Sequence, residues 1–484
     1  MDVENEYQEI RKKSFRGIKW VGIAEIFIRA FQFVTTVVLA RILLPEDFGI
    51  IGVALIFTQL GYVLFDFGIS SALIQKKDVK PIHYSSSFIL YLILSIFFII
   101  LVLLFSGPIS RYFHRTILQS ILNLLSLICL FYGLNAIPTV TLMKALRFKK
   151  LSAFQTCGVF AYGAVSIVFA WQGAGVWAFV YGILAEQFTM TVLLFISLSW
   201  RISFRFSWQA LKELLTFGSN VLGTRLVGYI NSNSAYFIIG RVLGATQLGY
   251  YSLAYQFVEF PVQRISKNVL KVMFPAFSKI QDDLANYRDL YKQTIYYLSL
   301  VTLPIFVGII LIAPEFVRIF YGDKWIPAIL PLQVLAAVGF LRSMWITTSI
   351  IFLSKGFPNT ELRINVTFLV FLIPTLYFST RFGIVGVAIS LASILLIFYA
   401  IAVFAALKII KLPFLEILKS FQIPVIGVCV FTLFVTLFKL FLENLFPSFL
   451  NFAIILTISI VIYSLILLKY DRDIFKKLKQ LIGA

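Results

Sequence analysis

The fold of the chain can be derived outward from a short polar joint at residues 39–49, which reads LARILLPEDFG. The joint separates two long apolar runs, at about residues 18–39 and 48–73. Each run is long enough to cross the hydrocarbon of a bilayer, which takes about 20 helical residues. Pro45 cannot continue a helix, because its ring removes a backbone N–H and clashes with the preceding turn. The joint therefore predicts two adjacent membrane-spanning helices.

A related joint follows 200 positions later, at residues 240–249, and reads GRVLGATQLG. The paired positions are Arg41 with Arg241, Leu43 with Leu243, Phe48 with Leu248, Gly49 with Gly249, and Ala54 with Ala254. Further along, GAGVWA at 173–178 resembles GIVGVA at 383–388. This spacing predicts a structural repeat of six helices. Six is even, so both copies would enter the bilayer from the same side, related by an axis along the membrane normal.

Composition indicates an all-α integral membrane protein. Apolar residues make up 60% of the chain and charged residues only 13%, far from the average for soluble domains. We expect about 14 transmembrane helices: one six-helix bundle at residues 1–205, a second at 206–410 as its parallel repeat, and two additional helices with a basic tail at 411–484. The expected spans are 18–39, 48–73, 85–106, 117–142, 151–171, 175–198, 214–239, 248–274, 291–313, 328–353, 366–380, 384–409, 421–441 and 446–468.

The positive charge follows the membrane topology. The net charge is +20, but the Lys and Arg residues gather in alternate loops, which is the pattern of cytoplasmic loops. Nucleic acid is therefore not an expected partner, and both termini are predicted to be cytoplasmic, with the basic tail at the lipid surface. We expect no cleavable signal peptide, since residues 1–13 are polar and the first apolar run is too long.

Charged side chains inside the predicted spans are the candidate functional residues. A charge at the bilayer centre costs about 3 kcal/mol or more unless it faces a partner or a water-filled cavity. The clearest are Glu25, Arg29, Asp66, Glu186, Arg225, Glu259 and Arg342. Four spans carry polar side chains every three or four residues, on one helical face. The stripes are Glu25, Arg29, Gln32 and Thr36; Gln59, Tyr62, Asp66 and Ser70; Arg225, Tyr229, Ser232 and Tyr236, beside Asn231 and Asn233; and Tyr251, Tyr255, Glu259 and Gln263, with a kink expected at Pro261. We expect these helices to line a polar cavity between the two halves.

Two interpretations of these charges stay open. Glu25 and Arg29 are spaced to neutralise each other, and Asp66 and Glu259 can pair with basic residues in the same way. Arg225 and Arg342 have no acidic residue one turn away on their own helices, which favours a role facing an anionic ligand. The predicted substrate-binding residues are Arg29, Arg225, Arg342, Tyr229, Asn233 and Tyr255, and the predicted coupling or pairing residues are Glu25, Asp66, Glu186 and Glu259.

No catalytic, cofactor or metal site is expected. The three cysteines stand singly in apolar spans, without the spacing of a metal site. His83 and His114 fall in loops predicted to lie on opposite sides of the membrane, so they cannot form a pair.

Residues 39–75, reading LARILLPEDFGIIGVALIFTQLGYVLFDFGISSALIQ, resemble the polysaccharide transporter family. That family includes Wzx-type O-antigen flippases and teichuronic or colanic acid exporters, in one superfamily with lipid II flippases and multidrug and toxin extruders. IIGRVLGATQLGYYSLAYQF at 238–257, FPAFS at 274–278 and YGDKW at 321–325 are also similar to it. The resemblance implies alternating access by two helical bundles and an undecaprenyl-pyrophosphate-linked oligosaccharide as cargo, moved to the outer leaflet of a bacterial plasma (inner) membrane.

Two other functions compete with this hypothesis. An ion-coupled extruder of small drugs would use Asp66 and Glu259 as proton or sodium sites, but cationic drugs would be repelled by an arginine-lined cavity. A membrane glycan polymerase or ligase would need a sizeable external loop with catalytic groups, whereas the longest outer connections, at 111–115 and 315–327, are short. A flippase that is not an enzyme is the function that the sequence favours.

Overall fold

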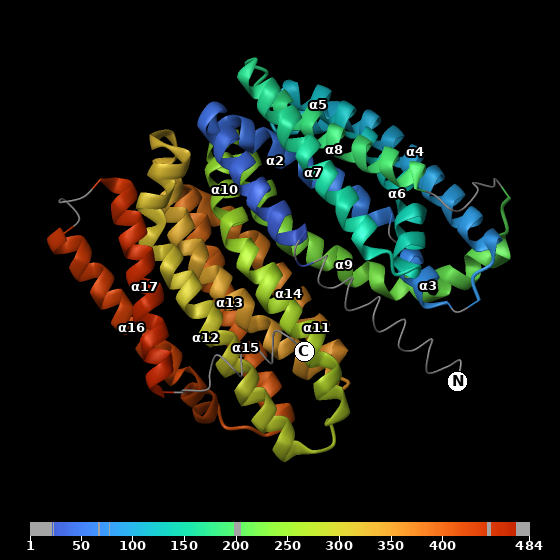
Figure 1. Ribbon diagram of the computed structural model, residues 1–484. Coiled ribbons are helices and arrows are strands. Elements are labelled where there is room, and N and C mark those ends of the chain that lie inside the picture. Colours follow the sequence, from blue (N-terminus) through green and yellow to red (C-terminus); the bar gives the residue numbers. More distant parts are fainter. Residues whose placement is uncertain are drawn as a thin grey trace. The chain divides into compact units, whose positions relative to one another are not determined.

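The computed structural model of the 484-residue chain describes residues 22, 24–65, 68–76, 78–197, 205–442 and 447–470, without the side chains of 216–225, 442, 448 and 470. Within these ranges the chain forms helices and short connections, and no β-strand is among them (Figure 1). The predicted all-α fold is therefore confirmed. The chain divides into two compact units, Met1–Gly249 and Tyr250–Ala484, each described here by itself.

The first unit opens with a helix at residues 24–42. It continues with α2 (Pro45–Phe65), α3 (Ile69–Gln75), α4 (Pro81–Tyr112), α5 (Ile117–Leu125), α6 (Leu127–Lys144), α7 (Phe148–Trp171), α8 (Trp177–Ile196), α9 (Trp208–Val242) and the start of α10 (Ala245–Pro261). Within this unit α7 packs along α8, and α4 packs along α6. Helix α9, which the repeat assigns to the second bundle, packs on α2, α3 and α4. The bundle boundaries drawn from the repeat stay a prediction.

The second unit holds the remaining helices. They are η1 (Val262–Ser266), α11 (Lys267–Lys279), α12 (Leu284–Phe316), η2 (Val317–Tyr321), η3 (Asp323–Ala328), α13 (Ile329–Ser354), α14 (Pro358–Ser379), η4 (Thr380–Phe382), α15 (Gly383–Ile410), α16 (Phe414–Leu442) and α17 (Ser448–Tyr470). Helix α13 lies between α12 and α15 in the packing, and α16 and α17 pack on α12. The last two helices are held there by a buried apolar cluster that includes Leu300, Phe431 and Ile455.

Two predicted spans are interrupted. Gly68 adopts a left-handed conformation (φ 74°) that divides the second span into α2 and α3, a conformation that glycine adopts without steric cost. The eighth span changes after Pro261 from α-helix to the five-residue π-helix η1 before α11 begins. A proline removes one hydrogen bond of the helix ladder, which is where such irregularities form.

Ten helical stretches in the described ranges are long and apolar enough to cross a membrane. One of them, Pro358–Ile410, contains two of the predicted spans, while the spans predicted at 18–39, 214–239 and 248–274 are not among the ten. All three of those spans carry predicted polar stripes, and the first of them is only partly described. The protein is a multi-pass membrane protein, and the number 14 stays a prediction.

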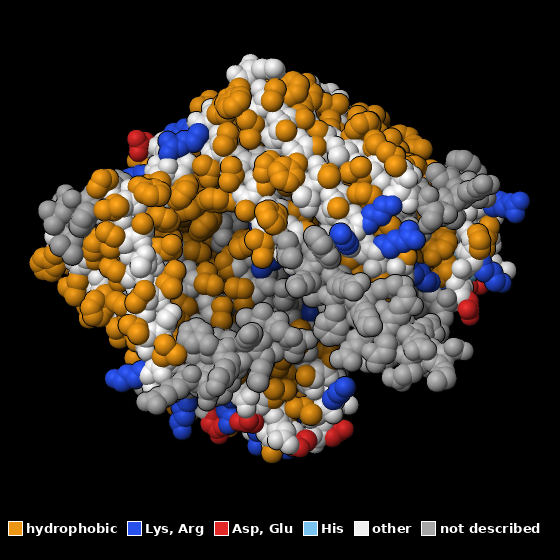
Figure 2. All heavy atoms as spheres, in the orientation of Figure 1, with side chains coloured by type: hydrophobic (Ala, Val, Ile, Leu, Met, Phe, Trp, Pro, Cys, Tyr) orange, Lys and Arg blue, Asp and Glu red, His pale blue; other side chains and the backbone are white. Residues whose placement is uncertain are grey.

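The surface has the chemistry of a lipid-facing protein. On the face that Figure 2 shows, hydrophobic side chains cover broad areas, and charged side chains gather mainly toward its margins. Large apolar residues such as Leu104, Ile196 and Phe441 are 70%, 79% and 75% exposed. A protein in water rarely leaves so much apolar surface uncovered, whereas lipid tails solvate it well.

Candidate functional site

A cavity of about 620 Å³ lies within the first unit. Its walls come from the helix at 24–42 and from α2, α3, α4, α6, α7 and α8. The polar side chains in the lining include Glu25, Arg29, Tyr62, Tyr91, Tyr132, Asn135, Gln155, Glu186 and Gln187. Its volume falls in the range of about 300–1,000 Å³ that small-molecule sites occupy. The cavity predicted between the two halves stays a prediction, since the cavity described here belongs to the first unit alone.

Glu25 and Arg29 form the ion pair that their spacing allows. The Arg29 Nε donates to Glu25 Oε1 at 2.8 Å, and its Nη1 donates to Gln32 Oε1 at 2.7 Å. The pairing interpretation of these two residues therefore holds. Both side chains are nevertheless accessible, with exposed fractions of 41% for Arg29 and 31% for Glu25. An accessible arginine with a carboxylate partner can exchange that partner for another anion.

Glu186 brings a second carboxylate to the cavity. It stands on α8, and its backbone and Cγ lie against Gly158 of α7, where a side chain would crowd them. Tyr132 and Tyr162 are close enough to interact with it electrostatically. No Lys, Arg or His in the described part of the chain forms an ion pair with Glu186. The lining named above thus contains two carboxylates and one guanidinium.

The second unit has a polar cluster of a different kind. The Arg342 Nη1 on α13 lies 2.5 Å from Glu259 Oε2 on α10 and also donates to the Tyr255 hydroxyl. The guanidinium lies 5.6 Å from the centre of the Tyr255 ring, which stacks on Tyr251. Arg342 and Glu259 are 27% and 22% exposed. The acidic partner that Arg342 lacks on its own helix is supplied by another helix.

Tyr229 and Asn233 of α9 direct polar groups into the protein. The Tyr229 hydroxyl donates to the backbone carbonyl of Ile56 on α2. The Asn233 side-chain amide donates to the carbonyl of Tyr229 at 3.0 Å. The first contact attaches α9 to α2 and the second lies within α9, while the substrate-binding role predicted for both residues stays a prediction.

Two of the candidates cannot be placed. Asp66 and the side chain of Arg225 lie outside the described residues. Their predicted roles, substrate binding for Arg225 and coupling or pairing for Asp66, therefore stay predictions.

The two repeated joints contact each other reciprocally within the first unit. A Cβ added to Gly49 would overlap the carbonyl group of Ala245, and one added to Gly249 would overlap that of Pro45. Because Pro45 and Gly49 correspond to Ala245 and Gly249, each copy presents the same glycine to the same position of the other. This is the contact expected if the two joints of the predicted repeat are related by a two-fold axis. We call this contact the glycine seam.

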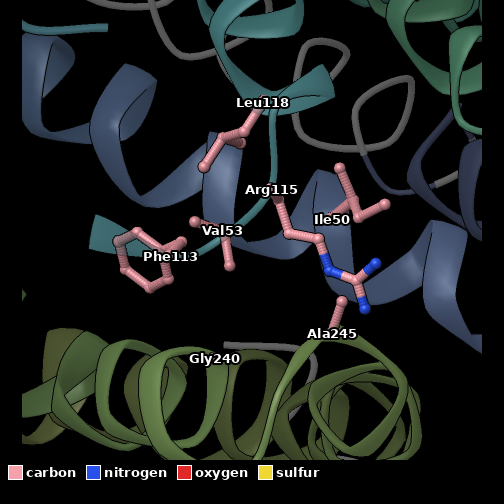
Figure 3. Close-up of a pocket in the computed structure, with 7 residues that line it drawn as sticks. All are labelled: Ile50, Val53, Phe113, Arg115, Leu118, Gly240 and Ala245. Carbon is pink, nitrogen blue, oxygen red and sulfur yellow. The ribbon is translucent and has the colours of Figure 1, made fainter. Parts of the chain in front are cut away.

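Beside the glycine seam lies a small pocket of about 10 Å³, drawn in Figure 3. The connection between α4 and α5 closes over it with Phe113 and Arg115, and Gly240 and Ala245 lie on the opposite side. Arg115 pairs with Glu46, at the start of α2, with 2.6 Å between Nη1 and Oε1. The pocket has room for about one water molecule, so this part of the unit is closed.

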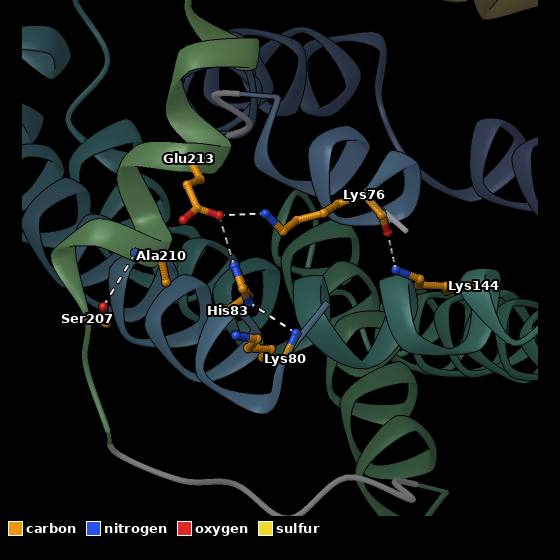
Figure 4. Close-up of polar contacts among 7 residues, drawn as sticks. All are labelled: Lys76, Lys80, His83, Lys144, Ser207, Ala210 and Glu213. Atoms are coloured by element: carbon orange, nitrogen blue, oxygen red, sulfur yellow. Dashed lines mark hydrogen bonds and ion pairs between the residues drawn. The ribbon is translucent and has the colours of Figure 1, made fainter. Parts of the chain in front are cut away.

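A second set of polar contacts joins the start of α9 to α3 and α4, shown in Figure 4. Glu213 Oε2 lies 2.5 Å from Lys76 Nζ and 3.3 Å from His83 Nε2. Lys144 donates to the carbonyl of Lys76 at 2.7 Å. The hydrogen bonds from Lys76 and His83 lower the pKa of the Glu213 carboxyl. Glu213 stands just before the span predicted at 214–239 and its side chain is 47% exposed, so these contacts are weak individually.

Several residues of the cavity were missed at the level of sequence. Tyr132, Asn135, Gln155 and Gln187 line it, although α6, α7 and α8 carry no polar stripe as strong as those of the four spans singled out. The signal that existed was the single Glu186 next to Gln187 in an apolar span. Within the described ranges no group of three or more His, Cys, Asp or Glu residues is placed to hold a metal ion.

Comparisons with known proteins identify relatives over most of the chain. A family model described as "Polysaccharide biosynthesis protein" matches residues 38–330. The lipopolysaccharide biosynthesis protein WzxC of Escherichia coli (strain K12) is 27% identical over 402 residues, which are 82% of each chain. The teichuronic acid biosynthesis protein TuaB of Bacillus subtilis (strain 168) is 27% identical over 350 residues, 72% of each chain.

Solved structures share the fold. The lipid II flippase MurJ in an inward closed conformation superposes with a TM-score of 0.73 at 18% identity, over 94% of this chain and 99% of that one. An inward-facing multidrug resistance transporter of the MATE family superposes with a TM-score of 0.63 at 16% identity, over 79% of this chain and 95% of that one. At these identities the likeness establishes a common helical architecture.

Proposed function

Because the chain belongs to the polysaccharide biosynthesis protein family, we propose that it is a flippase for a polyprenyl-pyrophosphate-linked oligosaccharide. The cargo moves from the cytoplasmic to the outer leaflet of a bacterial inner membrane, for the synthesis of a surface polysaccharide. The observation that carries the proposal is the cavity of about 620 Å³ among apolar membrane helices, whose wall includes charged and polar side chains. Such a chamber suits the hydrophilic head of a lipid-linked sugar, which cannot cross hydrocarbon unaided.

Movement follows alternating access. The head group enters a polar chamber open to one face of the bilayer while the polyprenyl tail stays in lipid. The protein then closes that face and opens the other. The shared architecture with a lipid II flippase and with a MATE transporter supports this scheme. The chain acts as a transporter and not as an enzyme, and both of its termini are cytoplasmic.

Arginines receive the pyrophosphate, since the planar guanidinium matches phosphate oxygens with two parallel hydrogen bonds. Arg29 lines the cavity and is 41% exposed, so it can leave Glu25 for a phosphate. Arg225 and Arg342 complete the cationic set. Tyr229, Asn233 and Tyr255 position the head group, and the carboxylates compensate the arginines when the cargo leaves or bind a coupling ion. These carboxylates are Glu25, Asp66, Glu186 and Glu259.

The membrane potential assists export. A pyrophosphate diester carries about two negative charges, and moving each outward across an inside-negative membrane gains about 2.3 kcal/mol per 100 mV. Proton or sodium coupling through the carboxylates adds to this. The partners are therefore undecaprenyl pyrophosphate with its sugar, the surrounding lipids and a coupling cation.

Reconstitution tests the proposal. The full-length protein is placed in liposomes with a fluorescent undecaprenyl-pyrophosphate-linked oligosaccharide, and a membrane-impermeant quencher reports the leaflet that the sugar occupies. We expect protein-dependent exchange, slowed more by Arg225→Ala than by Arg225→Lys, and faster export when an inside-negative potential is imposed. Exchange equal to that of protein-free liposomes overturns the flippase, and exchange that ignores the potential overturns the electrical assistance alone.

An ion-coupled extruder of cationic drugs is the second candidate, favoured by the two carboxylates that face one guanidinium in the cavity. Deleting the gene separates the two functions. Loss of surface polysaccharide with unchanged drug resistance supports the flippase, and increased drug sensitivity with intact polysaccharide supports the extruder.

A further inference from the structure

We propose that the cavity of the first unit is a glycan subsite that rejects acidic sugars, and that Glu186 sets this selectivity. The inference rests on the proposed flippase function and names the sugar chemistry that this site accepts. A neutral or amino-bearing sugar fits the cavity, and a uronic acid does not.

The first support is the charge of the lining. Arg29 is engaged by Glu25 and Gln32, at 2.8 and 2.7 Å, so its positive charge is compensated until the pyrophosphate displaces Glu25. Glu186 has no such cation among the described residues, although it lines the same cavity. A carboxylate on a sugar at this wall therefore meets the like charge of Glu186, and the two charges repel each other.

The second support is the kind of polar group that surrounds Glu186. Tyr132 lies near Glu186, and its ring contacts that of Tyr62 edge to face with centroids 5.1 Å apart. Gln155 and Gln187 add side-chain amides to the lining. Hydroxyls, amides and a carboxylate are partners for sugar hydroxyls and amines, and tyrosine faces offer flat apolar surface to a pyranose ring. Only Arg29 in this set favours an anion.

The two parts of the substrate therefore contact different residues. Arginines bind the pyrophosphate by the proposed function, whereas the inner wall formed by α6, α7 and α8 contacts the sugar. Selectivity then comes from a repulsive element as well as from attraction, as in other binding sites that discriminate between close analogues.

Three cargoes test the inference in proteoliposomes of the full-length chain: undecaprenyl-pyrophosphate-linked glucose, glucosamine and glucuronic acid. We expect the wild type to flip the glucuronic acid compound about tenfold more slowly than the glucose compound, the ratio that 1.4 kcal/mol of discrimination gives. Glu186→Gln should bring the two rates within about twofold, because the amide keeps hydrogen bonding and loses the charge. Glu186→Asp, which keeps the charge, should retain the discrimination.

Asp289→Asn is the matched control. Asp289 is an acid on α12 whose carboxylate accepts an exposed hydrogen bond from Gln293, outside the cavity, so its neutralisation changes net charge equally and should leave the ratio unchanged. Equal rates for glucose and glucuronic acid in the wild type, or an unchanged ratio in Glu186→Gln, overturns the inference while flipping itself stands. If none of the three cargoes is flipped, the proposed function fails as well.

Discussion

The charged side chains inside the predicted membrane spans differ between the two units in their exposure and in their partners. In the first unit, Arg29 and Glu25 are paired but accessible, and Glu186 faces a cavity with no described cation as its partner. In the second unit, Arg342 is held by Glu259 and by Tyr255, and both charged groups are about three-quarters covered. The first arrangement leaves an accessible arginine for a ligand, whereas in the second Arg342 has to leave Glu259 before it can bind one.

This difference predicts which charges matter most for the stability of the fold. A covered ion pair contributes little net stability when it is intact, but losing one partner leaves an uncompensated charge and costs several kcal/mol. An accessible pair costs little to lose, because water and ions replace the partner. We therefore expect substitutions in the second unit to act on stability first, and those in the first unit to act on transport first.

Gly49→Ala tests the glycine seam, where one helix of each cluster begins, and should have the largest effect. Helix α2 supplies Tyr62 to the cavity and α10 supplies Glu259 to the second cluster, and these two helices begin at the glycine seam. The added methyl meets backbone atoms, which cannot rotate away, so we expect about 3 kcal/mol of destabilisation by thermal unfolding in detergent.

Gly249→Ala should cost about as much as Gly49→Ala, and the double variant should cost less than the sum, because one displacement relieves both overlaps. Gly308→Ala is the control, since nothing lies within 4 Å of the added atom in α12. Equal effects of Gly308→Ala and Gly49→Ala would show that the glycine seam is not tightly packed.

Arg342→Leu should have the next largest effect. Glu259 loses its cation while about three-quarters covered, and we expect a loss of about 1–3 kcal/mol, reduced from the value for a fully buried pair by solvent screening. The unfolding temperature is the measurement. Combining it with Glu259→Leu should recover most of the loss. If the double variant regains stability but not flipping, Arg342 also contacts the cargo; if it is no more stable than the single one, the pair is not what holds α10 to α13.

Whether the sequence could predict an interaction depends on how far apart its two residues lie along the chain. The apolar runs predicted the helices, and the i, i+4 spacing predicted the pairing of Glu25 with Arg29, because both features are fixed by one helix. The pairing of Arg342 with Glu259 joins residues 83 positions apart, and no spacing reports which helices become neighbours. The cavity wall formed by Tyr132, Gln155 and Gln187 was missed for the same reason. Each of these polar residues lies on a helix of its own, and they form one wall only because three helices pack together.

Replacing both Glu25 and Arg29 by glutamine tests the accessible ion pair of the first unit. An accessible i, i+4 pair is worth about 0.3–0.5 kcal/mol, so the unfolding temperature should hardly move. Flipping should fall about tenfold, the effect of losing one charge-assisted hydrogen bond to the pyrophosphate. Both quantities are measured on the same preparation. A loss of stability as large as that of Arg342→Leu would erase the distinction between the two clusters.

The smallest effect is expected where polar contacts lie in water, at Glu213. Lys76 and His83 lower the pKa of this carboxyl, so its contribution to stability is present at pH values above the ordinary glutamate pKa of about 4.3. That contribution is lost as the pH falls through the lowered pKa of the folded state. The unfolding temperatures of the wild type and Glu213→Gln should therefore differ slightly at pH 7 and converge as the pH falls below about 4. A difference that persists in acid would mean that the glutamine perturbs packing, and one that rivals Arg342→Leu would mean that an exposed contact can hold a membrane helix as firmly as a covered one.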